Sequence, residues 1–381
     1  MGRDRMDDMR RCWSVVVCLL AGMSSCASPQ PTPADFAQQL PPKRDLTKAE
    51  RERVQRESAR ALEDLVAGRY VEARDRAREV LDVHPRSVRA RAVLGRSLGA
   101  LAWAEEPPDH AMATEAEGHL MLALRLAPDD AEARLFFAQL LIAEGHLSRA
   151  GQELEVLLSK HPRHQPGLRA AASVRYELGE ERAAAPLLSR LLTQAPQDAW
   201  ALYRLANCRV QLADAHLRGD SELSNKQDRV EVAVEAFHLA AKTFLEYQSV
   251  ARDDPAGYLG EAHARYRALV AGGKDQQGER STGAAIVALF QRAGKLDPKN
   301  PATLHGEGAV FDFLEDRERA RVAYEAALRL DANHVPSLLN LAALFYEDGQ
   351  KEKARDLWRR ALNLNITAGE KREIRKLLKE K

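Results

Sequence analysis

Residues 123–128 (ALRLAP), 157–162 (LLSKHP) and 191–196 (LLTQAP) repeat one pattern at a fixed spacing. Each segment is a leucine-rich turn followed by a proline, and the three prolines stand 34 residues apart. Because proline cannot continue a helix and often follows its end, each segment predicts a helix terminus. A constant period of this size predicts a repeat architecture in which each unit is a small helical motif.

Composition agrees with a helical repeat. Apolar residues make up 45% of the 381 residues and aromatic residues only 6%, so alanine and leucine must supply most of the core. These residues lose little side-chain freedom in helices, and no alternating runs of strand formers occur beyond the N-terminus. Lys plus Arg (57) and Asp plus Glu (56) nearly cancel. A near-neutral chain lacks the basic footprint of a nucleic-acid-binding protein, so we expect no nucleic-acid partner.

Other recurring residues stay in phase with the prolines. Leu94 and Gly95 form a leucine–glycine pair in an expected first helix. Glycine allows a tight turn, and small residues let two helices approach closely. A glycine is followed five residues later by alanine at Gly68/Ala73, Gly145/Ala150, Gly179/Ala184 and Gly349/Ala354. A series of alanine, aromatic residue and alanine occurs at Ala320/Tyr324/Ala327 and Ala354/Trp358/Ala361.

In these positions the chain resembles the tetratricopeptide repeat (TPR) family over residues 54–366, about eight units. The resemblance implies an all-α, right-handed α–α superhelix, a solenoid of about eight helical hairpins over residues 47–366. Thr47 and Glu50 form a capping-box pattern that predicts the start of the first helix. Residues 367–381, with Ile374, Leu377 and Leu378 on one face, are predicted to form a C-terminal capping helix.

Three insertions interrupt the period, near residues 103–115, 214–229 and 272–283. We expect them to lengthen helices and loops, above all in units five and six. A helical hairpin of another type remains an alternative in those two units.

Residues 12–23 form an apolar run preceded by Arg10 and Arg11. It is too short for a membrane span, which needs about 20 residues, and its flanks are typical of a secretory signal. Its end, Met23-Ser24-Ser25-Cys26, resembles a bacterial lipobox. The resemblance implies that residues 1–25 are a lipoprotein signal peptide and that Cys26 carries the lipid. An ordinary cleaved signal or a short buried helix remains possible, and Met1 and Met9 are both candidate start sites.

Residues 26–46 contain five prolines among polar residues and are predicted to form an extended tether. Ala27 follows the expected lipidated cysteine. In lipoproteins of Gram-negative bacteria this implies an outer-membrane lipoprotein that faces the periplasm. Of four cysteines, only Cys208 would remain unmodified in such a mature protein, so no internal disulfide is expected.

The sequence spells out no catalytic or metal site. No His-x3-His or Cys-x2-Cys pair occurs, and the glycine-rich stretch at residues 272–283 lacks the order of a phosphate-binding loop. We therefore predict no enzyme activity, no catalytic residues, no metal, no cofactor and no small-molecule substrate. The insertions leave an enzyme as a minor alternative.

The TPR resemblance implies that the first helix of each hairpin lines a concave, partner-binding face. Other proteins or extended peptides are the expected partners, because Trp, Tyr and Arg commonly anchor interfaces. For Trp200 and Tyr203, packing between neighbouring units is an equal alternative to partner binding. The positions that project inward are Arg89, Arg96, Leu135, Gln139, Ile142, Arg169, Tyr176, Trp200, Tyr203, Asn207, His305, Phe313, Leu339 and Tyr346.

These features lead to a functional hypothesis, a membrane-tethered scaffold or assembly factor for an envelope machine such as a pilus, secretion, motility or outer-membrane assembly system. The alternative is an adaptor that regulates an envelope protease or a peptidoglycan enzyme.

Overall fold

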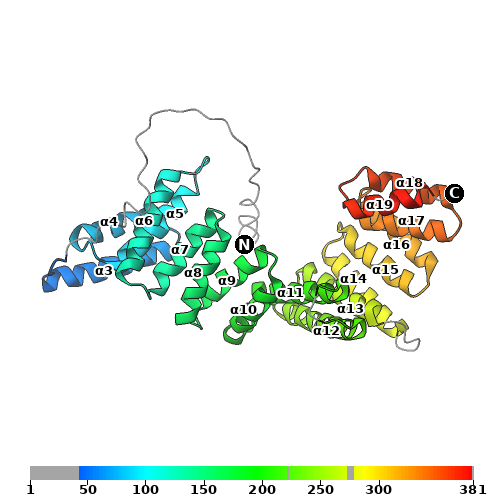
Figure 1. The fold of residues 1–381 in the computed structure, drawn as a ribbon, viewed down its shortest axis with the longest axis horizontal. Coiled ribbons are helices and arrows are strands. Elements are labelled where there is room, and N and C mark those ends of the chain that lie inside the picture. Colours follow the sequence, from blue (N-terminus) through cyan, green and yellow to red (C-terminus); the bar gives the residue numbers. More distant parts are fainter. Residues whose placement is uncertain (1–42, 221–222, 273–278, 380–381) are drawn as a thin grey trace.

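The computed structural model describes residues 43–220, 223–272 and 279–379. Those residues form 17 α-helices and no strand, arranged as eight successive hairpins and a final single helix (Figure 1). The all-α solenoid predicted from the 34-residue period is therefore confirmed. The hairpins pair α3 (Lys48–Val66) with α4 (Tyr70–Val83), α5 (Val88–Ala102) with α6 (His110–Leu126), α7 (Ala131–Ala143) with α8 (Leu147–Lys160), α9 (Gln165–Glu177) with α10 (Glu181–Gln194), α11 (Ala199–Arg218) with α12 (Lys226–Val250), α13 (Pro255–Gly272) with α14 (Glu279–Leu296), α15 (Pro301–Phe313) with α16 (Arg317–Leu330), and α17 (Val335–Glu347) with α18 (Lys351–Leu362), before α19 (Ala368–Leu377).

Side-chain caps start many of the first helices. Asp130 accepts a hydrogen bond from the backbone N–H of Ala133 at 2.8 Å, and Asp198 accepts one from Ala201 at 3.1 Å. Each cap satisfies one of the backbone donors that have no partner inside the helix. The same position recurs after each repeat proline, which explains why the chain restarts a helix there.

Glycines in the left-handed conformation form the turns within four hairpins, at Gly68, Gly145, Gly179 and Gly349, with φ between 71° and 77°. This was expected from the sequence. The seventh hairpin differs, because Glu315 occupies the corresponding position with φ of 64°. A residue with a Cβ is less favourable there.

The hairpins stack so that the two layers of helices are not equivalent. At most junctions a first helix packs against the next first helix, as in α3–α5, α5–α7, α7–α9, α11–α13, α13–α15 and α15–α17. Over the described residues, no pair of second helices makes a comparable contact. A stack whose first helices are closer together bends toward them. We call the layer of first helices the inner face and the layer of second helices the outer face.

The core between the layers is built mainly from alanine and leucine, with aromatic rings at close helix contacts. One buried cluster extends over α3 to α11 and another over α16 to α19, with smaller clusters between them. At Gly306 an added Cβ would lie 2.2 Å from the ring of Phe290, so only glycine lets α15 approach α14 this closely.

The fifth and sixth hairpins are longer than their neighbours. Helices α11 and α12 have 20 and 25 residues, and α13 and α14 have 18 each, whereas α7 to α10 have 13 or 14. The two later inserted stretches fall at the ends of these longer helices. The longer helices still pair as hairpins, α11 with α12 and α13 with α14.

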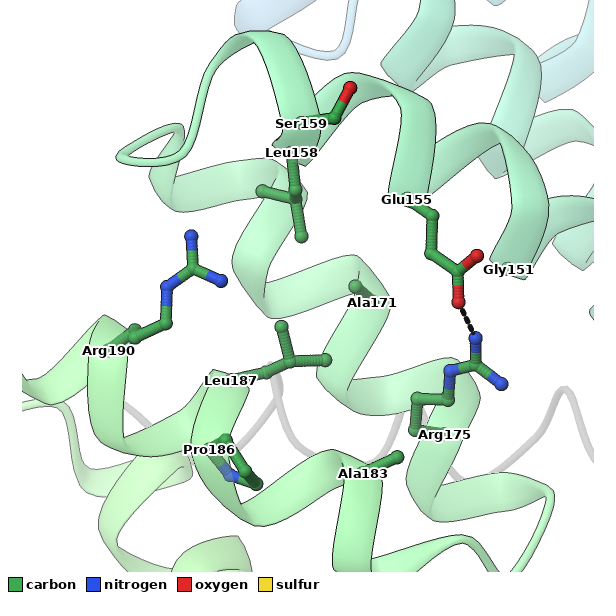
Figure 2. A pocket seen from close by; sticks show the side chains of 10 residues that line it. All are labelled: Gly151, Glu155, Leu158, Ser159, Ala171, Arg175, Ala183, Pro186, Leu187 and Arg190. Carbon is green, nitrogen blue, oxygen red and sulfur yellow. Dashed lines mark hydrogen bonds and ion pairs between the residues drawn. The ribbon is translucent and has the colours of Figure 1, made fainter.

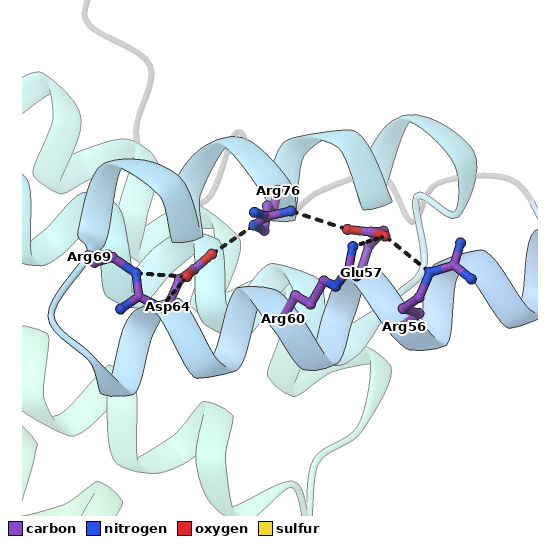
Figure 3. A network of polar contacts seen from close by, with 6 residues as sticks. All are labelled: Arg56, Glu57, Arg60, Asp64, Arg69 and Arg76. Atoms are coloured by element: carbon purple, nitrogen blue, oxygen red, sulfur yellow. Dashed lines mark hydrogen bonds and ion pairs between the residues drawn. The ribbon is translucent and has the colours of Figure 1, made fainter.

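The first hairpin is closed by a polar network (Figure 3). Asp64, which is buried, accepts hydrogen bonds from Arg69 at 2.6 and 2.9 Å and from Arg76 at 2.7 Å. Arg76 also reaches Glu57 at 3.3 Å, so α4 is connected to α3 at two points. The hydrogen bond from Arg69 holds the pKa of Asp64 below its ordinary value.

Both ends of the solenoid carry capping boxes. Thr47 and Glu50 exchange hydrogen bonds at the start of α3, and Thr367 and Glu370 do so at the start of α19. Ile374 of α19 is 3% exposed and packs on the C-terminal cluster. The predicted signal peptide, Cys26 and the predicted tether up to residue 42 lie outside the described residues.

Candidate partner-binding surface

All the predicted partner-binding residues lie on first helices, but they differ in what their side chains contact. On α5, Arg89 is exposed and Arg96 is half-buried in a cleft with Gln139 of α7. Ile142 is half-buried farther along α7. Leu135 requires a correction: it is only 6% exposed and belongs to the N-terminal core cluster. Its role is packing, because the apolar interior covers it.

Two arginine–aromatic pairs lie between the fourth and fifth hairpins. The guanidinium of Arg169 lies over the Trp200 ring, 4.7 Å from its centroid, and it also pairs with Asp198. The guanidinium of Arg204 lies over the ring of Tyr176 at 4.4 Å. Such cation–π contacts hold the rings in fixed orientations while leaving polar edges accessible.

The side chains of Tyr203 and Asn207 make contacts within the fifth hairpin itself. The Tyr203 ring lies 6.1 Å from Phe244 and 5.4 Å from Tyr247, both on α12. Asn207 donates a hydrogen bond to the Tyr203 carbonyl at 2.8 Å. These ring contacts of Tyr203 lie inside its own unit, whereas Trp200, which contacts Arg169 of α9, is the residue that packs between neighbouring units.

The C-terminal residues of the predicted surface also contact neighbouring aromatic side chains. His305 lies between Tyr324 at 5.6 Å and His334 at 5.4 Å, and burial lowers the pKa of His305 to about 4, so it is neutral near pH 7. Phe313 meets the edge of Tyr266 at 6.5 Å.

The last hairpin completes the predicted set. Tyr346 packs on Trp358 at 5.5 Å, with the Lys351 ammonium 5.9 Å from the Tyr346 ring. Leu339 is half-buried against the C-terminal cluster.

Two features of the surface were not predicted from the sequence. One is Arg204, whose stacking on Tyr176 depends on the offset between successive hairpins. The other is an outer groove of about 560 Å³ between α8, α9 and α10 (Figure 2). Leu158 and Leu187 line its floor, and Arg190 stands on one side opposite the ion-paired Glu155 and Arg175. The signals available in the sequence were one small residue on each of the three helices, Gly151, Ala171 and Ala183, together with Pro186 inside α10.

In the part of the chain that the structure describes, no group of three or more His, Cys, Asp or Glu side chains could hold a metal ion. Cys208 is buried, and burial raises the pKa of its thiol to about 12, which disfavours the reactive thiolate. Among the described helices, none has the length and apolar character needed to cross a membrane.

Comparison with known proteins finds tetratricopeptide repeats in this chain. Residues 337–365 match the tetratricopeptide repeat family. Together with the hairpin stack and the 34-residue period, this match identifies the chain as a tetratricopeptide repeat protein. Human tetratricopeptide repeat protein 7B is 31% identical over 87 residues, which are 23% of this chain and 10% of that protein.

Several solved structures are similar to this chain. A tetratricopeptide repeat protein from Parabacteroides merdae is 17% identical, with a TM-score of 0.49, over 74% of this chain and 98% of that one. YrrB, described as a TPR protein with an unusual peptide-binding site, is 16% identical, with a TM-score of 0.45, over 57% and 95% of the two chains. A thermophilic TPR protein from Thermus thermophilus is 22% identical, with a TM-score of 0.42, over 56% and 98%.

Proposed function

We propose that this TPR protein is a scaffold tethered to the periplasmic side of the outer membrane, where it helps to assemble an envelope machine. The family supports the general role, a protein–protein interaction scaffold. The resemblance of residues 23–26 to a lipobox supports the tether, and the proline-rich residues that follow would give the solenoid reach from the membrane surface. Anchoring raises the local concentration of the scaffold near envelope partners.

The observation that carries the binding role is the inner face between the second and fifth hairpins. It presents Arg89, Arg96 and Gln139, and then the rings of Tyr176 and Trp200, each in contact with a guanidinium. Arginine and large aromatic residues supply binding energy at protein interfaces because they combine apolar area with directed hydrogen bonds. The long, open stack suits an extended segment of a partner.

The test has two parts in living cells. Labelling with a clickable palmitate analogue should mark the wild-type protein and leave Cys26→Ala unmarked. A photo-crosslinking residue placed at Tyr176 should then capture envelope proteins. The same residue at Val156, which is 43% exposed on the outer-face helix α8, is the matched control and should capture fewer of them.

The outcomes separate the parts of the proposal. Absence of label from both proteins would exclude the lipid anchor. Crosslinks to subunits of an assembly would support the scaffold and identify its machine. Crosslinks to a protease or a peptidoglycan enzyme would instead support the alternative of a regulatory adaptor.

A further inference from the structure

We propose that the outer side of the last helix, α19, binds the surface of an anionic phospholipid bilayer. This cationic face consists of Lys371, Arg372, Arg375 and Lys376, and Lys379 directly follows the helix. The inference rests on the proposed location at a membrane. It gives the chain a second contact with that membrane, at the opposite end of the solenoid from α3 (Figure 1).

The geometry of α19 separates charges that alternate in its sequence. With about 3.6 residues per turn, the four cations fall within an arc of about 140°. Ile374, which is 3% exposed, and the half-buried Leu377 lie on the other side, against the C-terminal cluster. Glu370 also lies there, where it accepts hydrogen bonds from the N–H and the hydroxyl of Thr367 at 2.8 and 2.7 Å. Glu373 is left at the edge of the arc, so the outer side of α19 is predominantly positive.

No internal anion neutralises the cationic face. Among the described residues, none forms an ion pair or a hydrogen bond with the side chains of these four cations or of Lys379. The acidic residues of the adjacent α18 pair within their own helix, Glu352 with Arg355 at 2.6 Å and Asp356 with Arg359 at 2.9 Å. The helix dipole favours the two cations in the last turn but not the two before it. The charge of this face is therefore available to an external anion.

The other end of the solenoid provides an internal comparison. Helix α3 carries five basic and five acidic residues, whereas residues 368–379 carry five basic and two acidic ones. Arg56 and Arg60 of α3 both pair with Glu57, at 3.3 and 3.2 Å. Both helices end the stack, but only the C-terminal one has an excess of charge.

The lack of apolar anchors favours a lipid surface over a protein. Among the described residues of α17 to α19, no large hydrophobic side chain is exposed. Protein interfaces depend on apolar and aromatic anchors that become buried, whereas clusters of Lys and Arg bind anionic lipid headgroups by charge. Of the described helices only α18 makes a substantial contact with α19, so the cationic face can approach a flat surface.

The cationic face and the proposed lipid anchor would reinforce each other. Attachment at one end of the chain raises the local concentration of membrane surface at the other end. A basic patch is the kind of second signal that turns weak lipid anchoring into stable binding. The solenoid would then be held at both ends, which orients its inner face relative to the bilayer.

The experiment measures co-sedimentation of the full-length Cys26→Ala chain, which cannot carry a lipid at that position, with two kinds of vesicle. One kind is phosphatidylcholine alone, and the other contains about 30% phosphatidylglycerol. The partition coefficient should be at least ~10-fold higher for the anionic vesicles, and this excess should disappear in about 1 M NaCl because salt screens the charges. The N-terminal apolar run is present in every variant compared.

Matched charge variants locate the binding face. Combined Arg372→Gln, Arg375→Gln and Lys376→Gln substitutions should lower the excess at least ~10-fold. Circular dichroism and hydrogen exchange of this variant should match those of the parent chain, because the three side chains have no partner among the described residues. The control removes the same number of exposed charges from α3 and should change the excess less than ~2-fold, through Lys48→Gln, Arg51→Gln and Arg53→Gln.

Several results would overturn the inference. These are equal partition to the two kinds of vesicle, an excess that survives high salt, and an α19 variant that binds as well as the parent chain. In cells, a photo-crosslinking residue at Arg372 should capture phospholipid. Capture of protein or nucleic acid without lipid would assign the face to another partner and reject the proposal. Labelling at Cys26 and crosslinking from Tyr176 decide the proposed function separately, because neither depends on α19.

Discussion

Gly179 and Gly151 have different backbone conformations, and alanine should have opposite effects at the two positions. Gly179 has φ of 71° and open space around an added Cβ, so the cost of Gly179→Ala is purely conformational, about 1 kcal/mol. Gly151 lies inside α8, where the nearest atom to an added Cβ is 3.7 Å away. Gly151→Ala should stabilise the protein by about 0.5 kcal/mol or more, because alanine is the better helix former. Urea unfolding of both variants checks the prediction, and equal signs would contradict it.

Two half-buried histidines should make the C-terminal half sensitive to acid. Burial lowers the pKa of His263 and of His305 to about 4, and the charges of Arg267 and His334 act in the same direction. Between about pH 6.5 and pH 4 the unfolded chain binds more protons than the folded chain, so stability falls as the pH falls. At about pH 5 the loss should be on the order of 1–2 kcal/mol for each histidine, relative to about pH 7.

Variants at these positions provide the measurement. His305→Gln should lose less stability than the wild type between about pH 7 and about pH 5 in chemical unfolding. His238→Gln, at an exposed position of α12, should retain the full wild-type loss. An unchanged pH dependence in His305→Gln would show that His305 is not the group that titrates.

At the scale of the elements, α19 should protect the end of the solenoid. Ile374 is the buried anchor of this helix, and its neighbours in the C-terminal cluster include Trp358 and Phe345. Ile374→Ala should cost about 2 kcal/mol or more, because it removes buried apolar volume. In hydrogen exchange the effect should be confined to α17, α18 and α19. Arg372→Ala on the exposed face of α19 is the control and should change exchange little, whereas a response that reached α3 would contradict this role.

The elements were predictable because their signals are local. A proline soon after five of the eight second helices, a glycine in four of the turns and a capping side chain before six of the eight first helices act within a few residues. Together they determined the number and pairing of the helices. Glu315 shows a limit of these local signals. Its turn needs a residue in the left-handed conformation, and a glutamate takes that conformation, so no glycine marks this turn in the sequence.

The candidate surface was less predictable, because its properties depend on contacts between hairpins. Projection of the repeat placed Leu135 and Arg96 on the same face, and sequence alone could not show that the core covers Leu135. The stacking of Arg204 on Tyr176 and the groove beside Pro186 likewise depend on how neighbouring units are offset.

At the scale of the whole molecule, the chain should unfold in parts rather than all at once. Every substantial helix contact within the described residues joins helices one or two places apart along the chain. The two large clusters, over α3–α11 and α16–α19, are connected only through smaller ones. In such a stack stability is close to a sum of units and their interfaces, so damage at one end need not reach the other.

Two matched core variants test this prediction. Leu141 of α7 is 0% exposed and Leu341 of α17 is 3% exposed, so each alanine substitution should cost about 2–5 kcal/mol. Leu141→Ala should accelerate amide exchange in α3 to α10 and leave α15 to α19 at wild-type rates, and Leu341→Ala should give the reverse pattern. If both variants instead accelerated exchange evenly along the chain, the solenoid would be one cooperative unit. Binding energy gained at one end of the stack would then stabilise the distant end as well, which the modular arrangement does not allow.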